Sequence, residues 1–154
     1  MGQFAVQFAK VRGAAVFATA SADNLEFVSS PGADLVIDYQ SQAFEKGAKN
    51  VYMVLDLIGG DTRKRTWQVL NRGGILVSSL GQPNKQQAAK YGVRACDYET
   101  QPDASQLDKI RDVIDAGKVS PTVTKTFSLD SAAEAHRYLK RKHPRGKLVL
   151  AVDS

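Results

Sequence analysis

Small polar residues and glycines follow several apolar runs in this sequence. They are Thr19 and Ser21, Asp38 and Tyr39, Asp56, and Ser78, Ser79 and Gly81. Hydroxyl and carboxylate groups can hydrogen-bond to a ribose, and glycines let the backbone come close to a phosphate. If the apolar runs are strands of one parallel sheet, their carboxyl ends meet at one edge, where ligands bind. The pattern predicts a nucleotide site there. The simpler interpretation is that strand ends face loops and are polar for that reason alone.

Ser21 follows the apolar run at residues 15–19 and bears on the choice of dinucleotide. An acidic side chain at this place would accept hydrogen bonds from both ribose hydroxyls and repel a 2′-phosphate, which favours NAD. The neutral hydroxyl of Ser21 tolerates a 2′-phosphate, so NADP(H) is slightly favoured. Asp23, two residues later, leaves NAD(H) open as the alternative.

Metal and nucleophile chemistry are weakly supported. The soft ligands Cys96, His136 and His143 are not paired at a metal-binding spacing, so no metal site is predicted. Cys96 is interpreted as a small buried hydrophobic residue. Tyr138 and Lys142 match the Tyr-x-x-x-Lys spacing of short-chain dehydrogenases, but they lie at the far end of the chain and are interpreted as coincidence. No catalytic residue is predicted.

Basic residues gather in two places, and the formal net charge is +5. One cluster is Arg63, Lys64 and Arg65, and the other lies between residues 137 and 147. The simpler interpretation is a solvated helix face, and the alternative is a site for a cofactor phosphate. Without interleaved aromatic residues or a known module, nucleic acid is disfavoured as a partner.

Length and composition point to one soluble domain. No apolar run approaches the roughly 18 residues that span a bilayer, so no membrane partner is expected. Polar residues at helical spacing in the first ten positions argue against a signal peptide. The single cysteine excludes an internal disulfide. We therefore expect a cytoplasmic location.

Helical and strand periodicities alternate along the whole chain. Helices are predicted at residues 1–10, 24–29, 61–70, 84–91, 107–114 and 131–142, and strands at 15–19, 35–37, 51–58, 75–80, 93–96, 122–127 and 147–152. Gly13 should stop the first helix, Ser21 should cap the second, and residues 71–74 should form a turn. This alternation predicts an α/β fold, with a parallel sheet covered by helices on both faces.

Several segments, in order, carry a resemblance to a known family. They are residues 18–21, 32–39, 54–60, 73–77 and 145–150. Together they resemble the cofactor domain of medium-chain dehydrogenases/reductases, most closely the zinc-free quinone oxidoreductases that are filed with the zinc-binding dehydrogenases. The resemblance implies a Rossmann-like domain at about residues 1–120 and a strand–helix–strand return segment at about 121–154. It also implies a metal-independent hydride transfer from NADPH to a quinone or an α,β-unsaturated carbonyl.

The resemblance also implies roles for individual residues. Gly2 resembles the last glycine of the family's phosphate-binding turn. Ser21 and Tyr39 match residues that hold the adenosine ribose and 2′-phosphate, and Asn24 stands where the family often has lysine. The wall beside the nicotinamide would be formed by Leu57, Ser79, Leu80 and Gly81, with Cys96 at the following strand and Lys142 or Arg145 reaching the cofactor near the end.

Two departures from the family pattern affect the expected function. The sequence lacks the family's N-terminal barrel-like domain and the first, central strand of the cofactor domain. We expect the strands at Val16 and Val36 to lose their neighbour, which would expose sheet edges and favour association between copies. We interpret the chain as the cofactor part of an enzyme, either a fragment or a truncated product. The alternative is a non-catalytic remnant that binds nucleotides or oligomerises.

Overall fold

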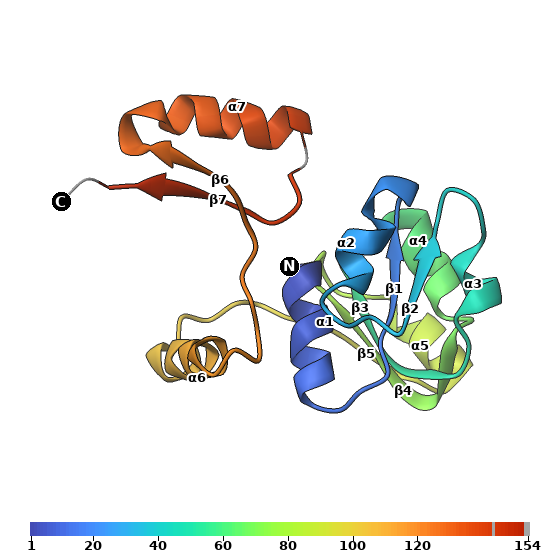
Figure 1. Ribbon diagram of the computed structural model, residues 1–154. Helices are drawn as coiled ribbons and strands as arrows, with labels where there is room; N and C mark the ends of the chain where they lie inside the picture. The colour runs from blue at the N-terminus through green and yellow to red at the C-terminus, as the bar shows by residue number, and fades with distance from the viewer. Residues whose placement is uncertain (143, 153–154) are drawn as a thin grey trace.

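A computed structural model describes residues 1–142 and 144–152 (Figure 1). Its helices are α1 (Gly2–Val11), α2 (Leu25–Ser29), α3 (Phe44–Gly47), α4 (Gly60–Thr66), α5 (Lys85–Tyr91), α6 (Ala104–Asp115) and α7 (Ala132–Lys142). Its strands are β1 (Phe17–Ala20), β2 (Leu35–Asp38), β3 (Val51–Asp56), β4 (Leu70–Ser78), β5 (Arg94–Asp97), β6 (Val123–Ser128) and β7 (Lys147–Ala151). Short 3₁₀ turns, η1 (Ala22–Asn24) and η2 (Leu129–Ser131), precede α2 and α7.

All of the paired strands run parallel. The described residues form three ladders, with the orders β1-β2, β3-β4-β5 and β6-β7. Parallel strands joined through helices are the arrangement of doubly wound α/β domains. The α/β fold predicted from the alternating periodicities, and its Rossmann-like character implied by the family resemblance, are therefore confirmed.

The expectation about which strands lack a neighbour was wrong in part. The strand at Val36 is β2, and it keeps β1 as its partner over four residue pairs. Among the described residues, β1 pairs only with β2, and β3 pairs only with β4. β1 and β3 therefore each have one edge without a partner strand among the described residues.

Two apolar clusters form the core around these strands. Ile37 on β2 packs with Phe44, Ala48 and Val69, and Val51 and Val54 of β3 lie against this cluster. The second cluster lies under β4 and consists of Trp67, Leu76, Ala88 and Val93. Phe44 explains why a short helix, α3, forms inside a segment that is otherwise polar: the residue is 6% exposed, and its ring anchors the turn.

β4 differs from its prediction. Residues 71–74 were expected to form a turn before the strand, but β4 already begins at Leu70 and continues to Ser78. The pairing with β3 shifts from Val51–Leu70 to Met53–Ile75, so the residues between are a bulge within the strand. Gly73, with a φ of 80°, gives the bulge a backbone conformation that other residues rarely adopt.

β6, α7 and β7 form a separate unit, drawn in orange and red in Figure 1. Gly146 begins the return into β7 with a φ of 117°, and a Cβ atom there would lie 2.5 Å from the carbonyl oxygen of Thr122. The close approach lets Lys147 N–H donate to that same oxygen at 2.8 Å. Within the described ranges, no helix combines the length and apolar character needed to cross a bilayer.

Candidate functional site

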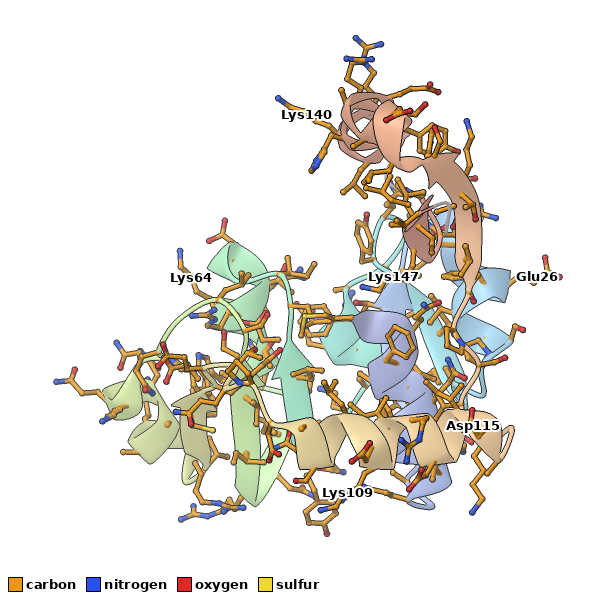
Figure 2. All side chains as sticks on the ribbon, turned by 90° about the vertical axis from the view of Figure 1, so that its left-hand side faces the viewer. Glu26, Lys64, Lys109, Asp115, Lys140 and Lys147 are labelled. Carbon is orange, nitrogen blue, oxygen red and sulfur yellow. The ribbon has the colours of Figure 1, made fainter. Side chains whose placement is uncertain are left out.

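Four of the predicted site residues line one pocket of about 360 Å³. Ser21 and Asn24 follow β1, Tyr39 follows β2, and Arg145 reaches in from the turn before β7. Lys147, labelled in Figure 2, lies in the same lining and adds a second cation. The pocket thus combines hydroxyl, amide and phenol groups with two positive charges, a donor set suited to a sugar phosphate.

The polar residues in this pocket are bonded to one another. Asn24 Nδ2 donates to Ser21 Oγ at 2.8 Å, and Arg145 Nε donates to Asn24 Oδ1 at 2.7 Å. Arg145 Nη2 also donates to the carbonyl oxygen of Asp23. Ser21 had been expected to cap the following helix, but its hydroxyl makes no cap hydrogen bond. The network instead fixes a guanidinium from the end of the chain beside the turn after β1.

The start of α1 joins this pocket to the ends of β3 and β5. Met1 lines the pocket, and its sulfur lies 3.7 Å from the hydroxyl of Tyr98, just after β5. A Cβ at Gly2 would lie 3.8 Å from a methyl group of Leu57, just after β3. The first turn of α1 has no acidic residue and no side-chain cap. Its positive helix dipole is therefore open to an anion.

Asp56 organises the ends of β3 and β4. Its Oδ1 accepts from the backbone N–H groups of Ile58 and Gly59 at 3.0 and 2.8 Å, and its Oδ2 accepts from Arg63 Nε at 2.5 Å. Ser79 N–H donates to the Asp56 carbonyl oxygen at 3.1 Å. Burial alone would raise the pKa of Asp56, but the donors Gly59, Arg63 and Ile58 together hold that pKa below its usual value.

The remaining predicted residues divide between the ends of the strands and other positions. Leu57, Ser79, Leu80 and Gly81 lie just after β3 and β4, at the edge where Asp56 lies. Cys96 is within β5, paired with Val77 one residue before the strand ends. The side chain of Lys142 lies outside the described part of the structure. Among the described residues, no three His, Cys, Asp or Glu side chains cluster as metal ligands would.

Two cations, Arg63 and Lys147, were named from the sequence only as members of the basic clusters. The simpler interpretation of those clusters was a solvated helix face and the alternative was a site for a cofactor phosphate, yet Arg63 is only 18% exposed. One signal for Arg63 was available: an Asp at the end of an apolar strand requires a partner if it is buried. Which of the three neighbouring cations would supply that partner depends on the turn at Gly59 and Gly60.

Comparison with known proteins places the chain in a family. The model of the zinc-binding dehydrogenase family matches residues 31–150. The NADPH-dependent alkenal/one oxidoreductase of Arabidopsis thaliana chloroplasts is 34% identical and covers 97% of this chain. The solved quinone oxidoreductase of Coxiella burnetii is 30% identical, covers 99% of this chain and has a TM-score of 0.86. The Escherichia coli quinone oxidoreductase, solved in complex with NADPH, is 25% identical over 96% of the chain, with a TM-score of 0.75.

The chain spans about half, or less, of the length of the curated relatives it matches. It covers 37% of the plant enzyme and 49% and 53% of the two solved chains.

Proposed function

Because this chain belongs to the zinc-binding dehydrogenase family, we propose that it provides the cofactor-binding part of an NADPH-dependent oxidoreductase. The proposed reaction reduces a quinone or an α,β-unsaturated carbonyl without a metal ion. The relatives support this substrate class: two are quinone oxidoreductases, and one is an NADPH-dependent alkenal/one oxidoreductase.

The observation that carries the proposal is the pocket formed by Ser21, Asn24, Tyr39 and Arg145. Its cations and neutral donors fit a ribose that bears a 2′-phosphate. Ser21 leaves that phosphate unopposed, because it places no carboxylate at the end of β1. The open N-terminal turn of α1 then lies where the pyrophosphate would pass toward Leu57 and the loop after β4.

The residues of this chain bind and orient the cofactor, and NADPH when bound supplies the hydride. Arg145 and Lys147 offset the charge of the 2′-phosphate. The backbone N–H groups of Gly2 and Gln3, at the start of α1, would face the pyrophosphate. The apolar side chains after β3 and β4 exclude water beside the nicotinamide.

Exchange of one cation tests this assignment. In the full chain, Arg145→Met should weaken NADPH binding by about 10-fold or more, because a charge-assisted hydrogen bond contributes about 1.5–3 kcal/mol. NADH binding should change by less than about 2-fold, because NADH lacks the phosphate. Lys140→Met, a cation on α7 outside the pocket lining, is the control. An equal loss for NADPH and NADH would contradict the proposed role of Arg145.

A second candidate is a nucleotide-binding or oligomerising remnant without turnover. It is favoured by the three separate ladders and the exposed apolar side chains of β1 and β3. NADPH oxidation with a small quinone acceptor separates the two. Turnover that is retained after chelation by EDTA supports the metal-independent enzyme, whereas cofactor binding without turnover supports the remnant.

A further inference from the structure

Arg63 differs from the two cations that follow it on α4. Lys64 points into solvent (Figure 2), where its side chain is 78% exposed and pairs with Asp61, whose side chain is 89% exposed. Arg65 turns toward α3 and pairs with Glu45 at 3.1 Å. Arg63 instead lies against the ends of two strands, with its side chain 18% exposed. The three consecutive cations of α4 therefore lie in three different environments: the strand ends, the solvent and the surface of α3.

The Arg63 guanidinium connects β3 to the segment after β4. Its Nε donates to Asp56 Oδ2 at 2.5 Å, at the end of β3. Its Nη2 donates to Ser78 Oγ at 2.6 Å and to the Leu80 carbonyl oxygen at 3.1 Å. Its Nη1 lies 3.5 Å from the carbonyl oxygen of Gly81. A planar guanidinium can bind several acceptors in fixed directions, so it holds both strand ends in one geometry.

The segment that Arg63 holds, residues 79–81, presents apolar surface to solvent. Leu80 is 52% exposed, and Ile58 at the neighbouring strand end is 69% exposed. Leu80 also approaches Gly59 closely, since a Cβ at Gly59 would lie 3.2 Å from a Leu80 methyl group. Ser78 Oγ, which accepts from Arg63, also accepts from Leu80 N–H at 3.0 Å. The segment is therefore ordered by polar contacts beneath it while its apolar side remains open.

The same segment leads back to the start of α1. Tyr98 N–H donates to the Ser78 carbonyl oxygen at 3.2 Å, and the Tyr98 hydroxyl lies near Met1. The pocket around Ser21 and Arg145 contains Met1 but none of residues 56–81. Arg63 can therefore influence one end of an extended ligand without touching the other.

We propose that Arg63 is a positioning residue, which orders residues 79–81 as the wall for the nicotinamide end of the cofactor. This inference rests on the proposed function, because it assigns the open side of that segment to the nicotinamide. A segment ordered in advance binds a ligand more tightly than one that the ligand must order. Arg63 acts through the segment and makes no contact with the reacting atoms.

The first experiment needs no cofactor. Amide hydrogen exchange of the full chain is compared for the wild type, Arg63→Met and the matched control Lys64→Met. Arg63→Met should speed exchange at Leu80 by about 10-fold or more, while Lys64→Met should leave it unchanged. Unchanged exchange at Leu80 in Arg63→Met would overturn the positioning role, whatever the protein binds.

The second experiment separates the two ends of the ligand. Calorimetric titrations use NADPH and adenosine 2′,5′-bisphosphate, which contains only the adenosine end. Arg63→Met should lower NADPH affinity by about 10-fold and change bisphosphate affinity by less than about 2-fold. Arg63→Lys, which retains the charge for Asp56, should recover part of the loss. Ser78→Ala, which removes one acceptor and keeps the charges, should give a smaller loss of the same kind.

The outcomes distinguish this inference from the proposed function. Equal losses for both ligands in Arg63→Met and Ser78→Ala would show a general structural role and overturn the inference. Wild-type protein that binds neither ligand would overturn the proposed function, and the assignment of residues 79–81 to the nicotinamide would fall with it. Selective loss of NADPH affinity, together with faster exchange at Leu80, supports both.

Discussion

Asp56 is a buried carboxylate whose negative charge is stabilised by hydrogen-bond donors from the turn that follows it and from α4. Its side chain is 3% exposed, and three donors converge on its two oxygens from the turn after β3 and from α4. Removing a buried carboxylate leaves those donors, including a guanidinium, without their acceptor. At the scale of single residues, this side chain therefore determines whether the ends of β3 and β4 stay together.

Asp56→Asn should destabilise the protein by about 2 kcal/mol at neutral pH. The value is at the lower end for a buried ion pair, because Arg63 is 18% exposed. The pKa of Asp56 is lower in the folded protein than its usual value of 3.8. The carboxylate therefore stabilises the fold fully above that value, and the stabilisation is lost as the pH falls through the depressed pKa.

Urea unfolding of wild type and Asp56→Asn at several pH values measures this difference. The gap in unfolding free energy should be constant near neutral pH and should narrow at acidic pH. Asp61→Asn, which removes an exposed carboxylate from the same helix, should show a much smaller gap. If the difference in unfolding free energy between wild type and Asp56→Asn stayed constant down to the acid transition, Asp56 would not form an ionised pair with Arg63.

At the scale of elements, the return from α7 into β7 determines where Arg145 lies. Gly146 combines a φ of 117° with a backbone contact that leaves no room for a Cβ atom. The Thr124 hydroxyl also donates to the Arg145 carbonyl oxygen, so β6 holds the residue just before the glycine. The register between β6 and β7 thus places the guanidinium beside β1.

Gly146→Ala should destabilise the pairing of β6 with β7 more than a glycine-to-alanine substitution without a steric clash does. A positive φ alone disfavours alanine by about 1–2 kcal/mol, and the contact with Thr122 adds to that strain. Gly13→Ala is the matched control, because Gly13 has a φ of 75° with no atom within 4 Å of its added Cβ. Amide exchange at Lys147, whose N–H donates to Thr122, should speed up markedly in Gly146→Ala alone. Equal exchange in both variants would show that the contact is unimportant.

At the scale of the whole molecule, the strands of the described residues are divided among three ladders, and strands at the ends of these ladders carry exposed apolar side chains. Phe17 on β1 is 43% exposed, and Tyr52 and Met53 on β3 are 74% and 59% exposed. An unpaired edge with apolar side chains is a template for pairing with another chain. We therefore propose that another strand, from a second copy or from another chain, pairs at the edges of β1 and β3.

Met53→Lys should reduce self-association of the isolated chain by about 10-fold, the equivalent of about 1.4 kcal/mol. A lysine on an edge strand disfavours pairing, because its charge would have to be buried in the new sheet. Sedimentation velocity over a range of protein concentrations measures the change. Leu107→Lys, a substitution at a 66% exposed position on α6, is the control. The same association in wild type and Met53→Lys would exclude the β3 edge as the contact.

Except for the short helix α3, local patterns in the sequence predicted the type and order of the helices and strands. Gly13, with a φ of 75°, does end the first helix, and Asn84 accepts from Gln87 N–H as the cap of α5. Ser21 and Tyr39 could be placed at the strand ends from the sequence, because the residues after β1 and β2 follow directly from the positions of those strands. Such features depend on neighbours a few residues away, so periodicity and turn residues are sufficient to predict them.

Only the tertiary structure decided which distant side chains meet. Arg145 and Asn24 are 121 residues apart, and their hydrogen bond depends on how the β6–β7 unit returns to β1. The inward direction of Arg63 depends on the turn at Gly59 and on Ser78 at the end of β4. The bounds of β4 also differ from those that its pattern indicated, because the strand begins at Leu70. Contacts of this kind depend on strand pairing and on the burial of a charge, which no local run of residues encodes. The sequence by itself therefore determined a parallel α/β chain with polar strand ends, and the packing of those ends decided which of its cations line the pocket and which face water.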